Sequence, residues 1–189
     1  MHKYKCIFIH IPKNAGSSVL SLFDDAEGRK HAKWYDFYES NDYFFKKYTK
    51  FSIVREPTSR LISAYNYCLQ GGNSSPSDLA LKRTIEEGSD SFDEFVKNIL
   101  TYEFIMMQPL FLPQYLYIFD REGDCKVDSL LKYECLVSDW QLFSNQHGLP
   151  DVLPWTNKSN STVTEFNLSL SSEEKIKEMY QLDFKWLNY

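Results

Sequence analysis

The spacing of apolar and polar residues predicts strands and helices in alternation along the 189-residue chain. Short runs rich in β-branched and aromatic residues, at 4–9 and 51–54, predict strands. Each run is followed by apolar positions at helical spacing, at 17–25 and 58–69. Strands and helices in alternation are typical of a parallel sheet covered by helices. We therefore expect an α/β fold of three layers, with a central, mainly parallel sheet flanked by helices.

The later part of the chain contains further elements with their own end signals. Ser91 and Glu94 have the spacing of a capping box, so a helix is predicted to begin there. The glycine- and serine-rich stretch 71–77 predicts a loop, which is either a lid over an acceptor cleft or a plain connection. The other predicted elements are a strand at 115–119, a turn at 121–124, a strand within 127–136, a helix at 138–146 that stops at Gly148, and a helix at 172–182.

The most informative segment joins the first predicted strand to the first predicted helix. It reads Pro12-Lys13-Asn14-Ala15-Gly16-Ser17-Ser18. The first amides of a helix have no partner within the helix and the helix dipole is positive there, so such a loop can hold a phosphate or sulfate ester. Lys13 adds a positive charge, and Ser17 and Ser18 add hydroxyl donors. The lysine comes before the glycine, unlike in the loop that binds nucleoside triphosphates and magnesium. Taken alone, the pattern fits an ordinary strand, turn and helix equally well.

A second segment, at residues 51–67, offers a further contact for an anion. Arg55 ends the predicted strand, Pro57 opens the predicted helix, and Ser63 follows about two turns later. An arginine fork recognises a phosphate group through two hydrogen bonds, which lysine cannot reproduce. Arg55 and Ser63 are therefore candidates to hold one phosphate together. The alternative is a surface pair of Arg55 with Glu56, beside a helix that only packs.

Together, the two segments resemble the sulfotransferases that use 3′-phosphoadenosine 5′-phosphosulfate, and they are most similar to the carbohydrate sulfotransferases that modify glycans. The loop is similar to the family's 5′-phosphosulfate loop, and residues 54–65 are similar to its 3′-phosphate element. Weaker similarities follow in the expected order at 30–32, 132–136, 153–159 and 180–189.

The resemblance covers nearly the whole chain and implies both a fold and a reaction. The fold is a P-loop-like three-layer structure in a single sulfotransferase domain over residues 1–189. The reaction is in-line transfer of a sulfuryl group from 3′-phosphoadenosine 5′-phosphosulfate to a hydroxyl of an acceptor, either a glycan or a small hydroxylated molecule, without a metal.

The resemblance also implies roles for single residues. Lys13 is expected to meet the charge that develops on the leaving oxygen, and His31 is expected to be the general base. The basic neighbours of His31 should favour its neutral form. His10 and Glu134 are rival candidates for the base, and Trp155 stands where the group often has histidine. The residues expected to bind the donor are Lys13, Asn14, Ala15, Gly16, Ser17, Ser18, Arg55 and Ser63.

Charge and composition exclude some partners and keep one rival enzyme class. The net charge of −5 argues against a nucleic-acid partner. The four cysteines are scattered, so neither a zinc site nor a disulfide framework is expected. An apolar run before Asp120 mimics a magnesium-binding strand. It keeps a nucleotide-dependent kinase as the alternative enzyme, beside a non-catalytic module that binds nucleotides or glycans.

The sequence also bears on location. No segment is long and apolar enough to span a bilayer, and the first residues lack the pattern of a signal peptide. We therefore expect a cytoplasmic protein, most simply a bacterial one, with the Golgi lumen as its location only if an anchor had been removed. Neither the identity of the acceptor nor the oligomeric state is predicted.

Overall fold

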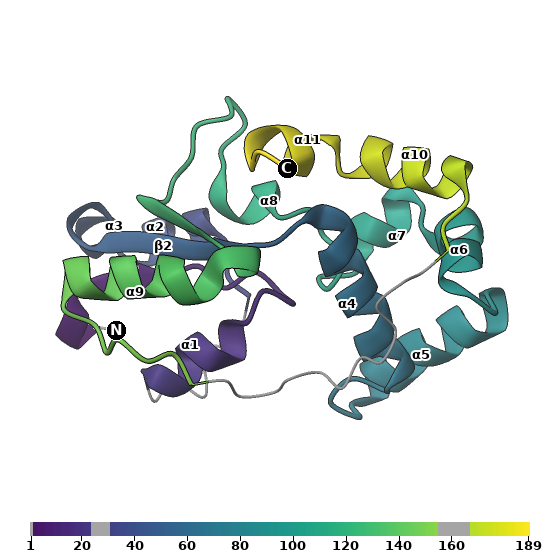
Figure 1. Ribbon diagram of the computed structural model, residues 1–189, viewed down its shortest axis with the longest axis horizontal. Coiled ribbons are helices and arrows are strands. Elements are labelled where there is room, and N and C mark those ends of the chain that lie inside the picture. Colours follow the sequence, from purple (N-terminus) through teal and green to yellow (C-terminus); the bar gives the residue numbers. More distant parts are fainter. Residues whose placement is uncertain (1, 24–30, 155–166) are drawn as a thin grey trace. The chain divides into compact units, whose positions relative to one another are not determined.

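The computed structural model describes residues 2–23, 31–154 and 167–189 (Figure 1). These residues form two compact units. The first unit comprises Met1–Glu56 and Gln114–Lys158, and the second comprises Pro57–Pro113 and Ser159–Tyr189. Each unit has its own apolar core.

The first unit is built on a parallel sheet of three strands in the order β1-β2-β3. The strands are β1 (Cys6–Phe8), β2 (Thr49–Val54) and β3 (Ser129–Lys132). Phe8 pairs with Phe51 in the sheet register, and Val54 pairs with Lys132. Because parallel strands need long crossovers, helices lie between them in the sequence and cover the sheet.

Alternate side chains of β2 face opposite sides of the sheet. On one side, Phe51 and Ile53 join a core with residues of α1 (Gly16–Leu22) and α9 (Leu136–His147). On the other side, the ammonium of Lys50 lies 5.4 Å from the centre of the Phe45 ring, which belongs to α3 (Asp42–Lys47). Helix α2 (Trp34–Ser40) packs with α3 through aromatic rings. The predicted α/β fold, a parallel sheet flanked by helices, is therefore confirmed.

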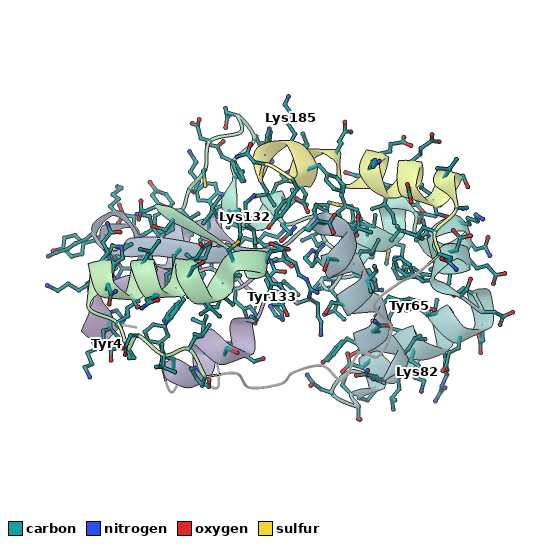
Figure 2. All side chains as sticks on the ribbon, in the orientation of Figure 1. Tyr4, Tyr65, Lys82, Lys132, Tyr133 and Lys185 are labelled. Carbon is teal, nitrogen blue, oxygen red and sulfur yellow. The ribbon has the colours of Figure 1, made fainter. Side chains whose placement is uncertain are left out.

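The second unit is helical. Its core contains Leu61, Tyr65, Phe95 and Ile176, and Tyr65 is marked in Figure 2. Its elements are α4 (Pro57–Leu69), α5 (Pro76–Gly88), α6 (Phe92–Glu94), the π-helix η2 (Phe95–Ile99), α7 (Tyr102–Met107), α10 (Leu170–Met179) and α11 (Gln181–Trp186).

Buried polar contacts hold α4 and the end of α10 to a loop that follows α7. Arg60 is fully buried and donates hydrogen bonds to the carbonyl oxygens of Leu110 (3.0 Å) and Leu112 (2.8 Å). The hydroxyl of Tyr180 donates to the carbonyl oxygen of Phe111 at 2.7 Å. These bonds satisfy backbone oxygens that burial would otherwise leave without a partner.

Several predicted elements are confirmed with small shifts of their ends. Both first strands, α1 and α4 lie where the apolar spacing predicted them. Helix α9 ends at Gly148, whose φ of 65° is a left-handed conformation that glycine adopts without strain. At the predicted turn, the carboxylate of Asp120 accepts hydrogen bonds from the amides of Glu122 (3.1 Å) and Asp124 (2.8 Å).

The predicted strand at 115–119 is wrong, because Tyr115–Ile118 forms the short helix α8. A short apolar run has no periodicity that separates a buried helical turn from a buried strand. The loop predicted at 71–77 gives way to α5 at Pro76, and Ser75 caps this helix by accepting a hydrogen bond from the amide of Asp78. The single helix predicted at 172–182 is two helices, which meet at the buried Tyr180.

Within the described ranges, none of the helices combines the length and the apolar character needed to cross a membrane.

Candidate functional site

The loop between β1 and α1 is held in a strained conformation by a buried asparagine. Lys13 and Ala15 have φ values of 70° and 58°, in the left-handed region that costs residues with a β-carbon about 1–2 kcal/mol each. Asn14 lies between them and is almost fully buried. Its Nδ2 donates to the carbonyl oxygen of Ile53 at 2.8 Å and to Oε1 of Gln114 at 2.7 Å. The side chain of Asn14 thus ties the loop to the end of β2.

The ring of His10 covers the start of α1. A β-carbon placed on Gly16 would lie 1.9 Å from Nε2 of His10, so the loop accepts only glycine at this position while the ring stays in place. The His10 ring is itself largely buried and stacks on Phe8, with ring centres 5.6 Å apart. The contact explains in physical terms why the predicted anion loop contains Gly16.

His31 lies against His10. The two ring centres are 4.4 Å apart, and Nδ1 of His31 is 3.3 Å from the carbonyl oxygen of His10. Because a carbonyl oxygen only accepts hydrogen bonds, this contact assigns the proton of a neutral imidazole to Nδ1 and leaves a lone pair on Nε2. A neutral imidazole with a lone pair on Nε2 can accept a proton.

Burial lowers the pKa of His31 from its ordinary value, and the hydrogen bond to the His10 carbonyl opposes this shift only partly. The predicted preference for the neutral form is therefore confirmed, but its physical cause differs from the one expected. The sequence argument relied on basic neighbours, of which Arg29 and Lys30 lie outside the described residues. Desolvation of the charged imidazolium is the larger effect.

Arg55 follows β2 and is fixed through both its backbone and its side chain. Its backbone N–H donates to Oε1 of Gln114 at 3.0 Å, and its carbonyl oxygen accepts from Nε2 of Gln114 at 2.7 Å. The guanidinium lies 4.2 Å from the centre of the Tyr133 ring, which is marked in Figure 2. One of its nitrogens, Nη1, is 3.4 Å from the carbonyl oxygen of Lys13. Arg55 therefore sits beside the loop.

The first unit thus brings together most of the residues that the sequence singled out. The loop residues 13–18, His31 and Arg55 are linked by the contacts above. Ser63 belongs to the second unit, where it is half-buried on α4. Glu134, in the short helix Tyr133–Cys135, accepts a hydrogen bond from the backbone N–H of Glu56 at 2.8 Å. Trp155 lies outside the described residues.

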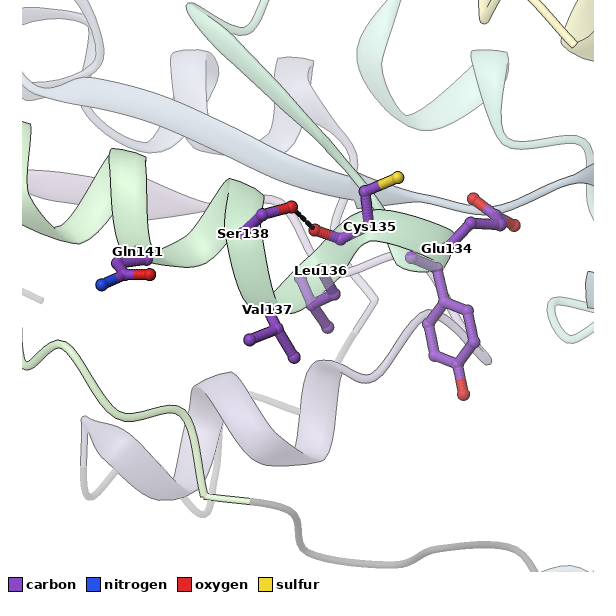
Figure 3. Close-up of a pocket in the computed structure, with 7 residues that line it drawn as sticks. Glu134, Cys135, Leu136, Val137, Ser138 and Gln141 are labelled. Atoms are coloured by element: carbon purple, nitrogen blue, oxygen red, sulfur yellow. Dashed lines mark hydrogen bonds between the residues drawn. The ribbon is translucent and has the colours of Figure 1, made fainter.

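A shallow hollow of about 460 Å³ lies at the start of α9 (Figure 3). It shares Tyr133 with the surroundings of Arg55, but the loop residues 13–18 do not line it. Two of the residues that line it are joined by a hydrogen bond, which the hydroxyl of Ser138 donates to the carbonyl oxygen of Cys135 at 2.8 Å. The candidate site is therefore defined by the contacts of the loop, His31 and Arg55. The residues that line the hollow are Tyr133, Glu134, Cys135, Leu136, Val137, Ser138 and Gln141.

Sequence reasoning missed Gln114, whose side chain contacts both Asn14 and Arg55. The residue is fully buried. A signal for it exists in the sequence, since it is the one amide side chain among the aliphatic, aromatic and proline residues of the stretch 109–118. A lone polar residue in such a stretch must find hydrogen-bond partners when it is buried. The sequence alone does not show which partners these are.

The matches found by comparison with known proteins are all sulfotransferases. The model of the sulfotransferase family matches residues 1–189. Carbohydrate sulfotransferase 11 from Rattus norvegicus and carbohydrate sulfotransferase 11 from Mus musculus are each 29% identical to the chain over 168 residues. The match covers 76% of this chain and 47% of each relative, so the chain spans about half the length of the curated relatives it matches. No solved structure matches the chain.

These comparisons confirm the resemblance drawn from the two motifs and correct the expected location. The expectation of a cytoplasmic protein, most simply a bacterial one, is wrong, because both curated relatives are carbohydrate sulfotransferases of mammals. The prediction rested on the lack of an apolar span. Such a lack does not identify the compartment in which a domain works.

Proposed function

Because the chain belongs to the sulfotransferase family, we propose that it transfers a sulfuryl group from 3′-phosphoadenosine 5′-phosphosulfate to a hydroxyl of a carbohydrate. The family match over residues 1–189 supports a single sulfotransferase domain. The names of the two curated relatives support a carbohydrate acceptor.

In this proposal the donor is held at both of its phosphate-bearing ends. The 5′-phosphosulfate lies on the loop, with Lys13 as the cation and with Asn14, Ala15, Gly16, Ser17 and Ser18 forming the turn that receives it. Arg55 and Ser63 bind the 3′-phosphate. The 3.4 Å contact between the Arg55 guanidinium and the Lys13 carbonyl oxygen supports one binding region for both ends of a nucleotide.

The chemistry that follows is a displacement at sulfur. The acceptor oxygen forms a bond to sulfur while the bond from sulfur to the bridging phosphate oxygen breaks, so 3′-phosphoadenosine 5′-phosphate leaves. Nε2 of His31 takes the proton of the acceptor hydroxyl, and Lys13 meets the negative charge on the leaving oxygen. No metal takes part in these steps.

The contact between His31 and the His10 carbonyl is the observation that carries the proposal. It leaves the lone pair on Nε2 in an imidazole whose pKa burial lowers, which are the two properties that a general base needs near neutral pH. The kinase alternative has lost its main argument, because the apolar run before Asp120 is a helix, α8, and not a magnesium-binding strand.

Calorimetry tests the donor. We expect 3′-phosphoadenosine 5′-phosphate to bind without metal, and adenosine 5′-phosphate to bind on the order of a hundredfold more weakly, because it lacks the charged 3′ contacts. ATP, with and without magnesium, is the comparison for the kinase alternative. Equal affinities for the two adenosine nucleotides would contradict the roles of Arg55 and Ser63. Binding that needs ATP and magnesium would contradict the proposed reaction. Transfer of labelled sulfate to a panel of glycans then tests the acceptor.

A further inference from the structure

The side chain of Gln114 connects two segments that are distant in the sequence. Its Oε1 accepts hydrogen bonds from Nδ2 of Asn14 at 2.7 Å and from the backbone N–H of Arg55 at 3.0 Å. Its Nε2 donates to the carbonyl oxygen of Arg55 at 2.7 Å. All these atoms belong to the first unit, and Gln114 is fully shielded from solvent. One planar amide therefore fixes the loop and the end of β2 at the same time.

The loop needs such an external support. Its backbone passes through two left-handed residues, Lys13 and Ala15, neither of which is glycine. A conformation of this kind persists only where surrounding contacts determine it. Asn14 supplies these contacts, and one of its two donated hydrogen bonds goes to Gln114. Loss of Gln114 would leave the Asn14 amide group with one of these two acceptors, the carbonyl oxygen of Ile53.

The glutamine amide satisfies all three contacts at once. An acceptor oxygen must face two N–H donors while a donor nitrogen faces the Arg55 carbonyl. The reversed orientation of the amide would place its NH₂ group against both donors, so the hydrogen-bond network fixes the orientation. Glutamate supplies the acceptors without the donor, asparagine is one methylene shorter, and methionine has the length without comparable polar groups.

We propose that Gln114 is a positioning residue that sets the separation between the Lys13–Ser18 loop and Arg55, so that one donor molecule can engage both with its 5′ and 3′ phosphate groups. This inference rests on the proposed function, since the two segments have a common ligand only if the donor is a nucleotide with two phosphate-bearing ends. Gln114 acts through Asn14 and Arg55 and does not itself touch the donor.

The test measures how well each variant distinguishes 3′-phosphoadenosine 5′-phosphate from adenosine 5′-phosphate. Gln114→Met keeps the length of the side chain and removes the three hydrogen bonds. We expect the affinity ratio of the two nucleotides to fall about tenfold, chiefly through weaker binding of the bisphosphate. A residue that contributed only to folding would lower the melting temperature and leave the ratio of the folded protein unchanged.

Ser144→Ala is the matched control. Ser144 is also fully buried in the first unit, and its hydroxyl donates to the carbonyl oxygen of Gln141 at 3.1 Å within α9. We expect this variant to lose some stability and to keep the wild-type affinity ratio. Retention of that ratio by Gln114→Met would overturn the positioning role while leaving the proposed function intact. A wild-type protein that binds both nucleotides equally would overturn both.

Gln114→Glu provides a second variant in case the methionine variant does not fold. It has the volume of glutamine, and a protonated carboxyl group again offers one acceptor oxygen and one donor. Burial raises the pKa of a carboxyl group, so protonation should occur at mildly acidic pH. We compare the affinity ratio of Gln114→Glu with that of the wild type at the same pH. We expect the ratio of the variant to lie below the wild-type ratio at pH 8 and to approach it as the pH falls to about 5. A relative ratio that is independent of pH and equal to that of the wild type would refute the proposal.

Discussion

Replacement of Gly16 by alanine tests the geometry of the loop directly. The added β-carbon would lie 1.9 Å from Nε2 and 2.0 Å from Cδ2 of His10, well inside contact distance. The ring cannot stay where it is, and its displacement breaks the stacking on Phe8. Gly16 is not among the residues with positive φ, so the backbone itself accepts alanine and the clash with His10 is the main penalty.

The expected loss follows from two opposing effects. Over-packing of a well-filled site costs about 1–3 kcal/mol. Alanine at the first helical position instead of glycine recovers at most about 1 kcal/mol through helix propensity. We therefore expect Gly16→Ala to lower the free energy of unfolding by about 1–2 kcal/mol. In a chain of this length, each kcal/mol corresponds to about 2–4 °C in the melting temperature.

A double-mutant cycle with His10→Ala isolates the clash from other effects. Removal of the imidazole frees the space that the alanine methyl group needs, so Gly16→Ala should cost little when His10 is already alanine. We expect a coupling of about 1 kcal/mol or more between the two changes, measured by thermal and urea unfolding. A coupling near zero would refute the proposed contact, as would a Gly16→Ala protein with wild-type stability.

Three further predictions concern the chemistry. His31→Ala should leave donor affinity nearly unchanged and lower the rate of single-turnover transfer by roughly 10²–10⁴-fold. His10→Ala should instead affect donor affinity or folding. If His31→Ala is active while His10→Ala binds the donor but is inactive, the assignment of the general base is reversed. Lys13→Ala should reduce turnover by about 10²–10³, more than it weakens binding of 3′-phosphoadenosine 5′-phosphate, and turnover near the wild-type level would limit Lys13 to docking. Burial lowers the pKa of His31 from 6.5, so the unfolded chain takes up the proton first as the pH falls. Both turnover and the contribution of His31 to stability should therefore be present above pH 6.5. Both should be lost as the pH drops through the lowered pKa of the folded protein. A pH-rate profile of the wild type whose acidic limb lies above 6.5, or one that His31→Ala shares, would contradict this prediction.

The parts of the site that sequence alone predicted are those whose signals are local. The strand, the loop with Lys13 and Gly16, and the helix that follows can be read from contiguous residues, because helix ends and anion loops depend on neighbours in the chain. Arg55 was predicted for the same reason, since it stands at the end of a β-rich run and just before a proline that opens a helix. Local signals also located α9 and its glycine cap.

The parts that were missed depend on contacts between distant residues. The apolar run at 115–118 fits a strand or a helix equally well, and only its packing in the first unit decides for α8. In the same way, no local rule identifies Gln114 as the partner of Asn14, 100 residues earlier in the chain. The two residues are linked by a physical requirement, because the N–H groups of the buried Asn14 amide need acceptors. A polar residue alone in an apolar run thus signals that a network exists, and only the folded chain shows that the network joins the loop to Arg55.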